Sequence, residues 1–158
     1  EHVPLLLNTL NDETELVRVE SARALQRIHS DLAVRPLIDK LSEDAEESSE
    51  VRAACAHALG QYPEPRVLAA LAAALRDQSL AVNISAEAAL GYLTGQDFGL
   101  DQRAWFAYIS ETSDPFVQPL AYEYPRFERD RRWIEYVPLV PPAPNEPAAQ
   151  PVGMPRQE

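Results

Sequence analysis

The sequence predicts an all-α protein, a short α-solenoid built from antiparallel helical hairpins. Three observations support this prediction: an internal repeat, apolar residues at helical spacing within each copy, and turn residues between the helices. The clearest copy is VRAACAHALG, Val51 to Gly60. In each of three copies a Val lies seven residues before an Ala, and the pairs are Val17 with Ala24, Val51 with Ala58, and Val82 with Ala89.

The repeat has one underlying period, and an insertion in the second copy lengthens one of its steps. The step from Val17 to Val51 is three residues longer than the step from Val51 to Val82. Leu41 lies ten residues before Val51, but Leu10 lies only seven residues before Val17. The second copy therefore has three extra residues in the acidic loop 42–50, and an exposed loop tolerates an insertion well. Without them the period is about 31 residues, which is typical of a helical repeat protein.

Each copy is expected to hold two helices. In the first copy they start at Val3 and at about Glu15, and the second copy restarts after Ser30. Pro63 and Pro65 suit the start of the first helix in the third copy, because proline is favoured at a helix N-terminus. We also expect the Gly at the end of the central stretch to stop its helix.

The repeat unit resembles a HEAT repeat of the short bacterial type, which also occurs in phycobilisome lyase-like proteins. The resemblance rests on the apolar first helix, the acidic turn, the Val-Arg pair and the Ala-Leu pair, and it covers about Val3 to Thr94. It implies a structural ladder in which a turn carboxylate and an Arg link neighbouring repeats. The candidates are Asp12 with Arg18, Asp77 with Asn83, and Arg52 with Glu43 or Asp44.

The following stretch, Leu93 to Glu111, is similar to the closing segment of many bacterial HEAT proteins. That similarity implies a Gly-bearing loop and a last helix that caps the stack. We expect Gly95 and Gly99 to form the turn and Asp101 to cap the helix. Trp105, Phe106 and Ile109 are expected to form the apolar side that covers the last repeat.

The composition suggests three segments. Residues 1–111 are expected to form the solenoid with its capping helix, 112–140 an extended docking segment, and 141–158 a flexible proline-rich tail. Ten of the fourteen prolines lie in 112–158, so this part cannot sustain long helices. The aromatic residues of 112–140 exceed what a disordered linker normally has, and we expect them to lie against protein.

The net charge of −11 argues against a nucleic-acid partner. Residues 1–111 hold 18 acidic and 9 basic side chains, a balance of −9. No apolar run is long enough to span a membrane. The chain begins without Met, so we expect a preceding segment, either a signal peptide or earlier repeats. Resemblance to exported bacterial proteins favours the cell envelope over the cytoplasm.

The candidate partner-binding residues are rich in Arg and aromatic side chains, as protein interfaces are. In the docking segment they are Phe127, Arg129, Arg131, Arg132, Trp133 and Tyr136. On the repeats they are Arg23, Arg27 and His57, together with Gln26 and Gln61. Interleaved acidic residues in 126–133 make single-stranded nucleic acid the less favoured ligand there.

No catalytic, cofactor or metal site is predicted. His29 and His57 lack a recognised metal-ligand spacing. Cys55 lies among alanines and is expected to be a buried small hydrophobe rather than a nucleophile. The acidic loop 42–50 lacks the ligand pattern of a calcium loop and is expected to be solvated.

The sequence therefore predicts a non-catalytic scaffold or accessory subunit of a larger bacterial assembly, whose partners are other protein subunits. It would bind through the solenoid surface and the extended tail. One alternative is a structural module whose tail folds back in cis as a cap. A less favoured alternative, from the resemblance alone, is a bilin lyase-like chromophore-binding protein.

Overall fold

The computed structural model describes residues 2–117 of the chain. This part of the chain contains seven helices and no strand, which confirms the predicted all-α solenoid class. The helices are α1 (Val3–Thr9), α2 (Glu15–Gln26), α3 (Asp31–Asp39), α4 (Ser49–Leu59), α5 (Pro65–Ala74), α6 (Leu80–Thr94) and α7 (Gln102–Glu111).

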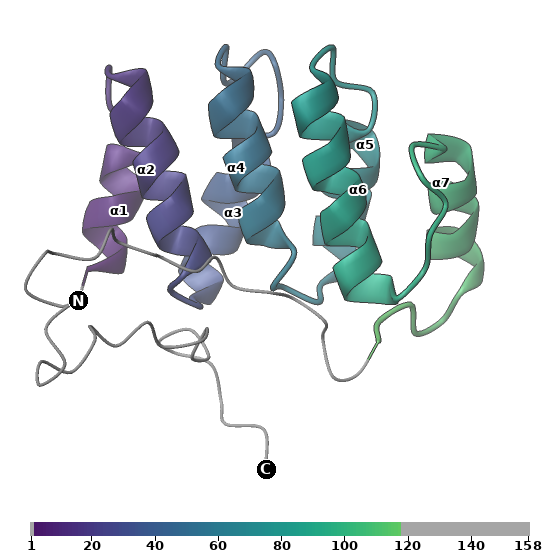
Figure 1. Cartoon of the computed structure of the whole chain (residues 1–158). Helices are drawn as coiled ribbons and strands as arrows, with labels where there is room; N and C mark the ends of the chain where they lie inside the picture. Colours follow the sequence, from purple (N-terminus) through teal and green to yellow (C-terminus); the bar gives the residue numbers. More distant parts are fainter. Residues whose placement is uncertain (1, 118–158) are drawn as a thin grey trace, which may run out of the picture.

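The helices lie in two layers (Figure 1). Helices α1 and α2, α3 and α4, and α5 and α6 form three successive hairpins. The even-numbered layer consists of α2, α4 and α6, in which each helix packs against the next, and it lies in front in Figure 1. The odd-numbered layer consists of α1, α3, α5 and α7, and α7 packs against α5. Helix α7 thus takes the place of the first helix of a fourth repeat.

The core runs through all three hairpins and centres on α4. Val51, Cys55, Ala56 and Leu59 on this helix are completely buried. The short Ala and Cys side chains let the helix backbones approach closely, and the interior of a protein tolerates few voids. This explains why an alanine-rich stretch of the sequence lies in the middle of the stack.

The helices begin and end at the predicted turn residues, and one of these residues has an unexpected backbone conformation. Pro65 is the first residue of α5, and the Asp101 side chain accepts hydrogen bonds from two backbone amides at the start of α7. Gly95 has a left-handed conformation at φ 67° and ends α6. Gly60 follows the last residue of α4 but has φ −60°, so it does not end the helix by a left-handed turn.

The closing helix is anchored by Trp105, which is completely buried. Its Nε1 donates to the carbonyl of Gly99 at 2.9 Å, and Phe98 packs edge-on against its ring at 4.9 Å. Ile109 packs partly buried against the core. Phe106, however, is 42% exposed, so the expectation that it covers the last repeat is wrong. It lies about 100° around the helix from Trp105, and Phe98 from the preceding loop fills the place beside Trp105.

After α7 the chain returns to the end of α6. Pro115 is buried, and its carbonyl accepts a hydrogen bond from the Tyr108 hydroxyl at 3.3 Å. The backbone amide of Val117 donates to the carbonyl of Leu93 at 2.9 Å, and the Val117 side chain lies beside Gly95. Residues beyond Glu111, as far as Val117, therefore also pack against the solenoid, beside the C-terminal end of α6.

Candidate functional site

Arg18, near the start of α2, joins the first repeat to the second. Its Nε and Nη2 donate to the two carboxylate oxygens of Glu46 at 2.9 and 2.7 Å. Its Nη1 donates to the backbone carbonyls of Asp12 and Glu13, in the turn before α2. One guanidinium therefore fixes the turn of its own repeat and holds a carboxylate of the next repeat.

Arg52 repeats this geometry between the second and third repeats. Its Nε and Nη2 donate to the Asp77 carboxylate at 2.7 and 2.9 Å, and its Nη1 donates to the carbonyls of Glu46 and Glu47. Both side chains of this pair are nearly buried, with 6% of Arg52 and 2% of Asp77 exposed. Two parallel hydrogen bonds in such a setting give a strong and directional contact.

The carboxylate that Arg18 binds comes from the next repeat and not from its own. Arg18 binds Asp12 through the backbone carbonyl, while the Asp12 carboxylate accepts a hydrogen bond from the Thr14 amide. Counted back from Arg52, the second-repeat position that corresponds to Asp12 is Glu46, six residues earlier. The predicted pairing of Arg52 with Glu43 is present only as a longer ion pair of 4.0 Å, beside the two hydrogen bonds to Asp77. The three extra residues of the second repeat therefore lie between Leu41 and Glu46.

Asn83 occupies the position that Arg18 and Arg52 hold in the earlier repeats. Its Oδ1 is buried and has no hydrogen-bond partner within residues 2–117. Asp77, six residues before it, is bound by Arg52 instead. Within the part of the chain that the structure describes, the series of inter-repeat pairs therefore ends at α6.

The two turn carboxylates have lowered pKa values. Burial alone would raise the pKa of Glu46, but hydrogen bonds from Arg18, the Ser48 amide and Lys40 outweigh it and hold the pKa below its ordinary range. Burial of Asp77 is likewise outweighed, chiefly by Arg52, so its pKa is also lowered. Both carboxylates are therefore charged in the folded protein at neutral pH.

A hollow of about 250 Å³ lies along the even-numbered layer. It is lined by Arg23 and Gln26 of α2, by Glu50, Ala53, Ala54 and His57 of α4, and by Ala81 and Ser85 of α6. The hollow crosses all three repeats and mixes one carboxylate and one guanidinium with small apolar side chains. Such a surface can accept a chain segment that offers both backbone polar groups and small side chains.

His57 lies partly buried in this hollow. Its Nδ1 lies 3.1 Å from Nε2 of Gln26, and its ring stacks on Tyr92 of α6 with centroids 6.4 Å apart. Gln26 is only 5% exposed but lines the hollow from α2. Gln61 is fully buried, so the expectation that it faces a partner is wrong. The Gln61 amide instead donates to backbone carbonyls, among them that of Ala58 at 3.1 Å.

The structure places Arg23 and Arg27 on the exposed surface of α2 and at its end. Arg23 pairs with Glu20 at 2.7 Å, and about half of each side chain is exposed. Phe127, Arg129, Arg131, Arg132, Trp133 and Tyr136 lie outside the described residues, so they remain predictions.

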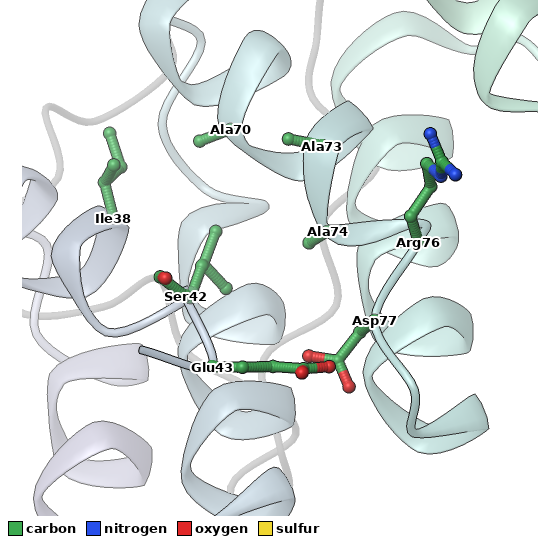
Figure 2. A pocket seen from close by; sticks show the side chains of 9 residues that line it. Ile38, Ser42, Glu43, Ala70, Ala73, Ala74, Arg76 and Asp77 are labelled. Atoms are coloured by element: carbon green, nitrogen blue, oxygen red, sulfur yellow. The ribbon is translucent and has the colours of Figure 1, made fainter. Parts of the chain in front are cut away.

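A second hollow, of about 400 Å³, lies on the odd-numbered layer between α3, α5 and the acidic loop (Figure 2). Its wall is largely apolar, with Ile38 and three alanines of α5. The Glu43 and Asp77 carboxylates point toward one another at its rim, and Arg76 points away. Both carboxylates already accept hydrogen bonds, from Gln78 and Arg52 respectively, so this hollow is explained by the inter-repeat packing.

The remaining chemical candidates have structural roles in the described part. Cys55 is completely buried, and burial raises the pKa of its thiol to about 12, which confirms it as a small hydrophobic core residue. His29 stacks on Tyr62 at 4.8 Å, and its Nδ1 lies 3.3 Å from Oε1 of Gln61. Between His2 and Val117, no three side chains of the His, Cys, Asp and Glu types gather as a metal site would require. None of the helices between these residues has the length and apolar character needed to cross a membrane.

Comparison with known protein families agrees with this architecture. A family model of HEAT repeats matches residues 3–91. The chain belongs to the HEAT-repeat family. The comparison with curated proteins gave no significant match. HEAT repeats generally serve as scaffolds for protein interactions and are generally non-catalytic, which fits the paired helices and inter-repeat arginines of this chain.

Proposed function

We propose that this HEAT-repeat protein is a non-catalytic scaffold or accessory subunit of a larger bacterial assembly. Its partner is another protein, bound on the even-numbered layer over the hollow that crosses α2, α4 and α6. The observation that carries this proposal is the hollow itself, which presents Arg23, Glu50 and His57 together on one face of the stack.

The pairing of the inter-repeat arginines supports this choice of surface. Arg18 and Arg52 are engaged in the turns and hold the repeats in fixed relative positions. The hollow is therefore presented by a preorganised set of helices, and preorganisation lowers the entropic cost of binding. A short row of small side chains, Ala53, Ala54 and Ala81, leaves room for the backbone of a partner segment.

Site-specific photo-crosslinking in native cells tests the proposal. A photo-reactive amino acid replaces Arg23 in the full chain, and Arg35 is replaced in a matched control. Both arginines are exposed and form an ion pair within their own helix, Arg23 with Glu20 and Arg35 with Asp39, but they lie on opposite layers. We expect a discrete protein adduct from position 23 and none from position 35.

Equal crosslinking at the two positions, or an adduct only at position 35, would contradict the assignment of the even-numbered layer. An adduct at position 23 that persists after Glu50→Arg and His57→Ala would place the partner outside the hollow. A discrete adduct that these two substitutions abolish, in a chain with unchanged circular dichroism, supports the proposed function.

A further inference from the structure

Helix α6 leaves one of its sides uncovered within residues 2–117. In the first repeat, Glu15 accepts a hydrogen bond from Ser48 of the next repeat, and Arg18 reaches from the same side of α2 to Glu46. The corresponding positions in α6 are Leu80 and Asn83. These residues therefore mark the side of α6 that points away from α4, where a fourth repeat would place its second helix.

The residues of this side form one stripe, which we call the open stripe. It consists of Leu80, Asn83, Ile84 and Glu87, spaced as one face of a helix. Leu80 is 60% exposed and Ile84 is 53% exposed, whereas the equivalent of Ile84 in the first repeat, Val19, is only 2% exposed. The stripe thus has apolar residues at the positions that pack between repeats, but within residues 2–117 no further repeat covers them.

The polar members of the open stripe also lack the surroundings that their counterparts have. Asn83 Oδ1 is buried without a donor within the described part of the chain. Glu87 takes the position of Ala22 and Ala56, both completely buried between repeats. A segment that covers the stripe must therefore bring apolar side chains together with hydrogen-bond donors or cations.

We propose that residues 118–140 of the same chain cover the open stripe in cis. The last described residue, Val117, is hydrogen-bonded to Leu93 at the C-terminal end of α6, so residue 118 begins beside this helix. From Leu93 back to Leu80 the helix is about 20 Å long. An extended chain spans that distance with roughly six or seven residues. The segment 118–140 is therefore more than long enough.

The composition of this segment matches the stripe. It supplies apolar rings, among them Tyr122, Tyr124 and Phe127, for the exposed Leu80 and Ile84. It also supplies four arginines, at positions 126, 129, 131 and 132, as donors for the Asn83 oxygen and as cations for Glu87. Aromatic and Arg side chains contribute strongly where they are buried against a surface.

A second copy of the chain fits the stripe less well. Its exposed N-terminal repeat would present the carboxylate of Asp12. The corresponding carboxylates of the second and third repeats, Glu46 and Asp77, are each bound by an Arg of the preceding repeat. The stripe offers Asn83 and Glu87 instead of an Arg, so a head-to-tail contact would bring two carboxylates together without the cation between them. Cis coverage by the Arg-rich segment avoids this mismatch.

A double-mutant cycle in the full chain tests the proposal. One substitution is Ile84→Arg on the stripe, and the other is the tail pair Phe127→Ser with Trp133→Ser. The matched control is Leu16→Arg, because Leu16 is also an exposed apolar residue, at 66%, but lies on α2 at the other end of the stack. The melting temperature is followed by circular dichroism at two protein concentrations, with the mass measured by light scattering.

We expect Ile84→Arg to lower the melting temperature by about 3 °C with the native tail and to have almost no effect with the substituted tail. Leu80→Arg is expected to behave in the same way, and Leu16→Arg to have the same effect in both backgrounds. Equal effects of Ile84→Arg in the two backgrounds would overturn the proposal. Coupling that appears only at the higher concentration, together with a dimer mass, would overturn it in favour of a second copy. Since no partner is needed, the outcome is independent of the photo-crosslinking result.

Discussion

Arg52 binds Asp77 of the following repeat through two hydrogen bonds of 2.7 and 2.9 Å, while its third nitrogen binds the turn of its own repeat. The same arrangement joins Arg18 to Glu46. Each repeat boundary within the described residues is therefore spanned by one arginine. Removing one partner leaves the other charge nearly buried, and the cost of that isolated charge exceeds the net gain of the pair itself.

Arg52→Lys is expected to lower the free energy of unfolding by about 2 kcal/mol. Lysine keeps the charge but cannot give the planar pair of hydrogen bonds to Asp77 or reach the turn carbonyls at the same time. Urea unfolding followed by circular dichroism measures the change. The control is Arg35→Lys, whose side chain is 73% exposed and pairs with Asp39 of the same helix, and we expect a change below about 0.5 kcal/mol there. Similar costs for the two variants would contradict the importance of the inter-repeat pair.

Acid is expected to weaken the repeat boundaries. The pKa values of Glu46 and Asp77 are lowered in the folded protein from ordinary values of 4.5 and 3.8. A carboxyl with a lowered folded-state pKa contributes stability that is complete above its unfolded pKa and is lost as the pH falls toward the folded value. The free energy of unfolding should therefore be steady near neutral pH and fall below about pH 4.5.

The measurement is a series of urea titrations between pH 7 and pH 3. In the Glu46→Gln and Asp77→Asn variants, the fall with acid should be shallower, because the titrating groups are gone. A fall as steep as that of the parent chain would assign the acid sensitivity to other carboxylates.

The fold was predictable because its main signals are local. The spacing of Val17, Val51 and Val82 places one branched residue at the same point of each second helix, and the small residues that follow fit only close helix packing. Pro65 at a helix start and Gly95 at a helix end depend on their own backbone conformation alone. Signals of this kind can be read without knowing any tertiary contact.

The errors concern residues whose surroundings come from other repeats. Glu46 could not be told from its acidic neighbours in the loop, since only the approach of Arg18 from the previous repeat distinguishes it. Gln61 is buried because backbone carbonyls from two helices satisfy its amide, and no local pattern indicates this. Phe106 is exposed because Phe98, from a loop, already packs against Trp105.

The position of the insertion gives a further prediction. Deletion of residues 43–45 would bring Leu41 as close to Glu46 as Leu75 is to Asp77. The Arg18–Glu46 pair is retained, and the lost contacts include the exposed hydrogen bonds between Glu43 and Gln78 and the 4.0 Å ion pair between Glu43 and Arg52. We expect the deletion to change the free energy of unfolding by less than about 1 kcal/mol.

The contrasting variant is Glu46→Ala, which keeps the length of the loop but leaves Arg18 without its carboxylate. This substitution should cost about 3 kcal/mol. Thermal and urea unfolding of both variants decide the matter. A deletion that is more harmful than Glu46→Ala would show that the extra residues belong elsewhere in the loop.

Gly91 within α6 and Gly95 directly after it allow the effect of backbone conformation to be separated from that of packing. Gly95 has φ 67°, a left-handed conformation that costs other residues about 1 kcal/mol, so Gly95→Ala is expected to destabilise the chain by that amount. Gly91 lies within the helix without a positive φ, and an added Cβ would have its nearest neighbour, the Gln96 carbonyl oxygen, at 3.6 Å.

Since that distance is ordinary van der Waals contact, Gly91→Ala should stabilise the chain by about 0.5 kcal/mol through the higher helix propensity of alanine. The two variants make the same chemical change four residues apart, so their opposite signs in urea unfolding isolate the effect of φ. If both substitutions destabilised the chain equally, crowding rather than conformation would govern the end of α6. If neither substitution destabilised the chain, a glycine at position 95 would not be needed to direct the chain from α6 into the next loop. That loop carries Gly99, whose carbonyl accepts the hydrogen bond from Trp105.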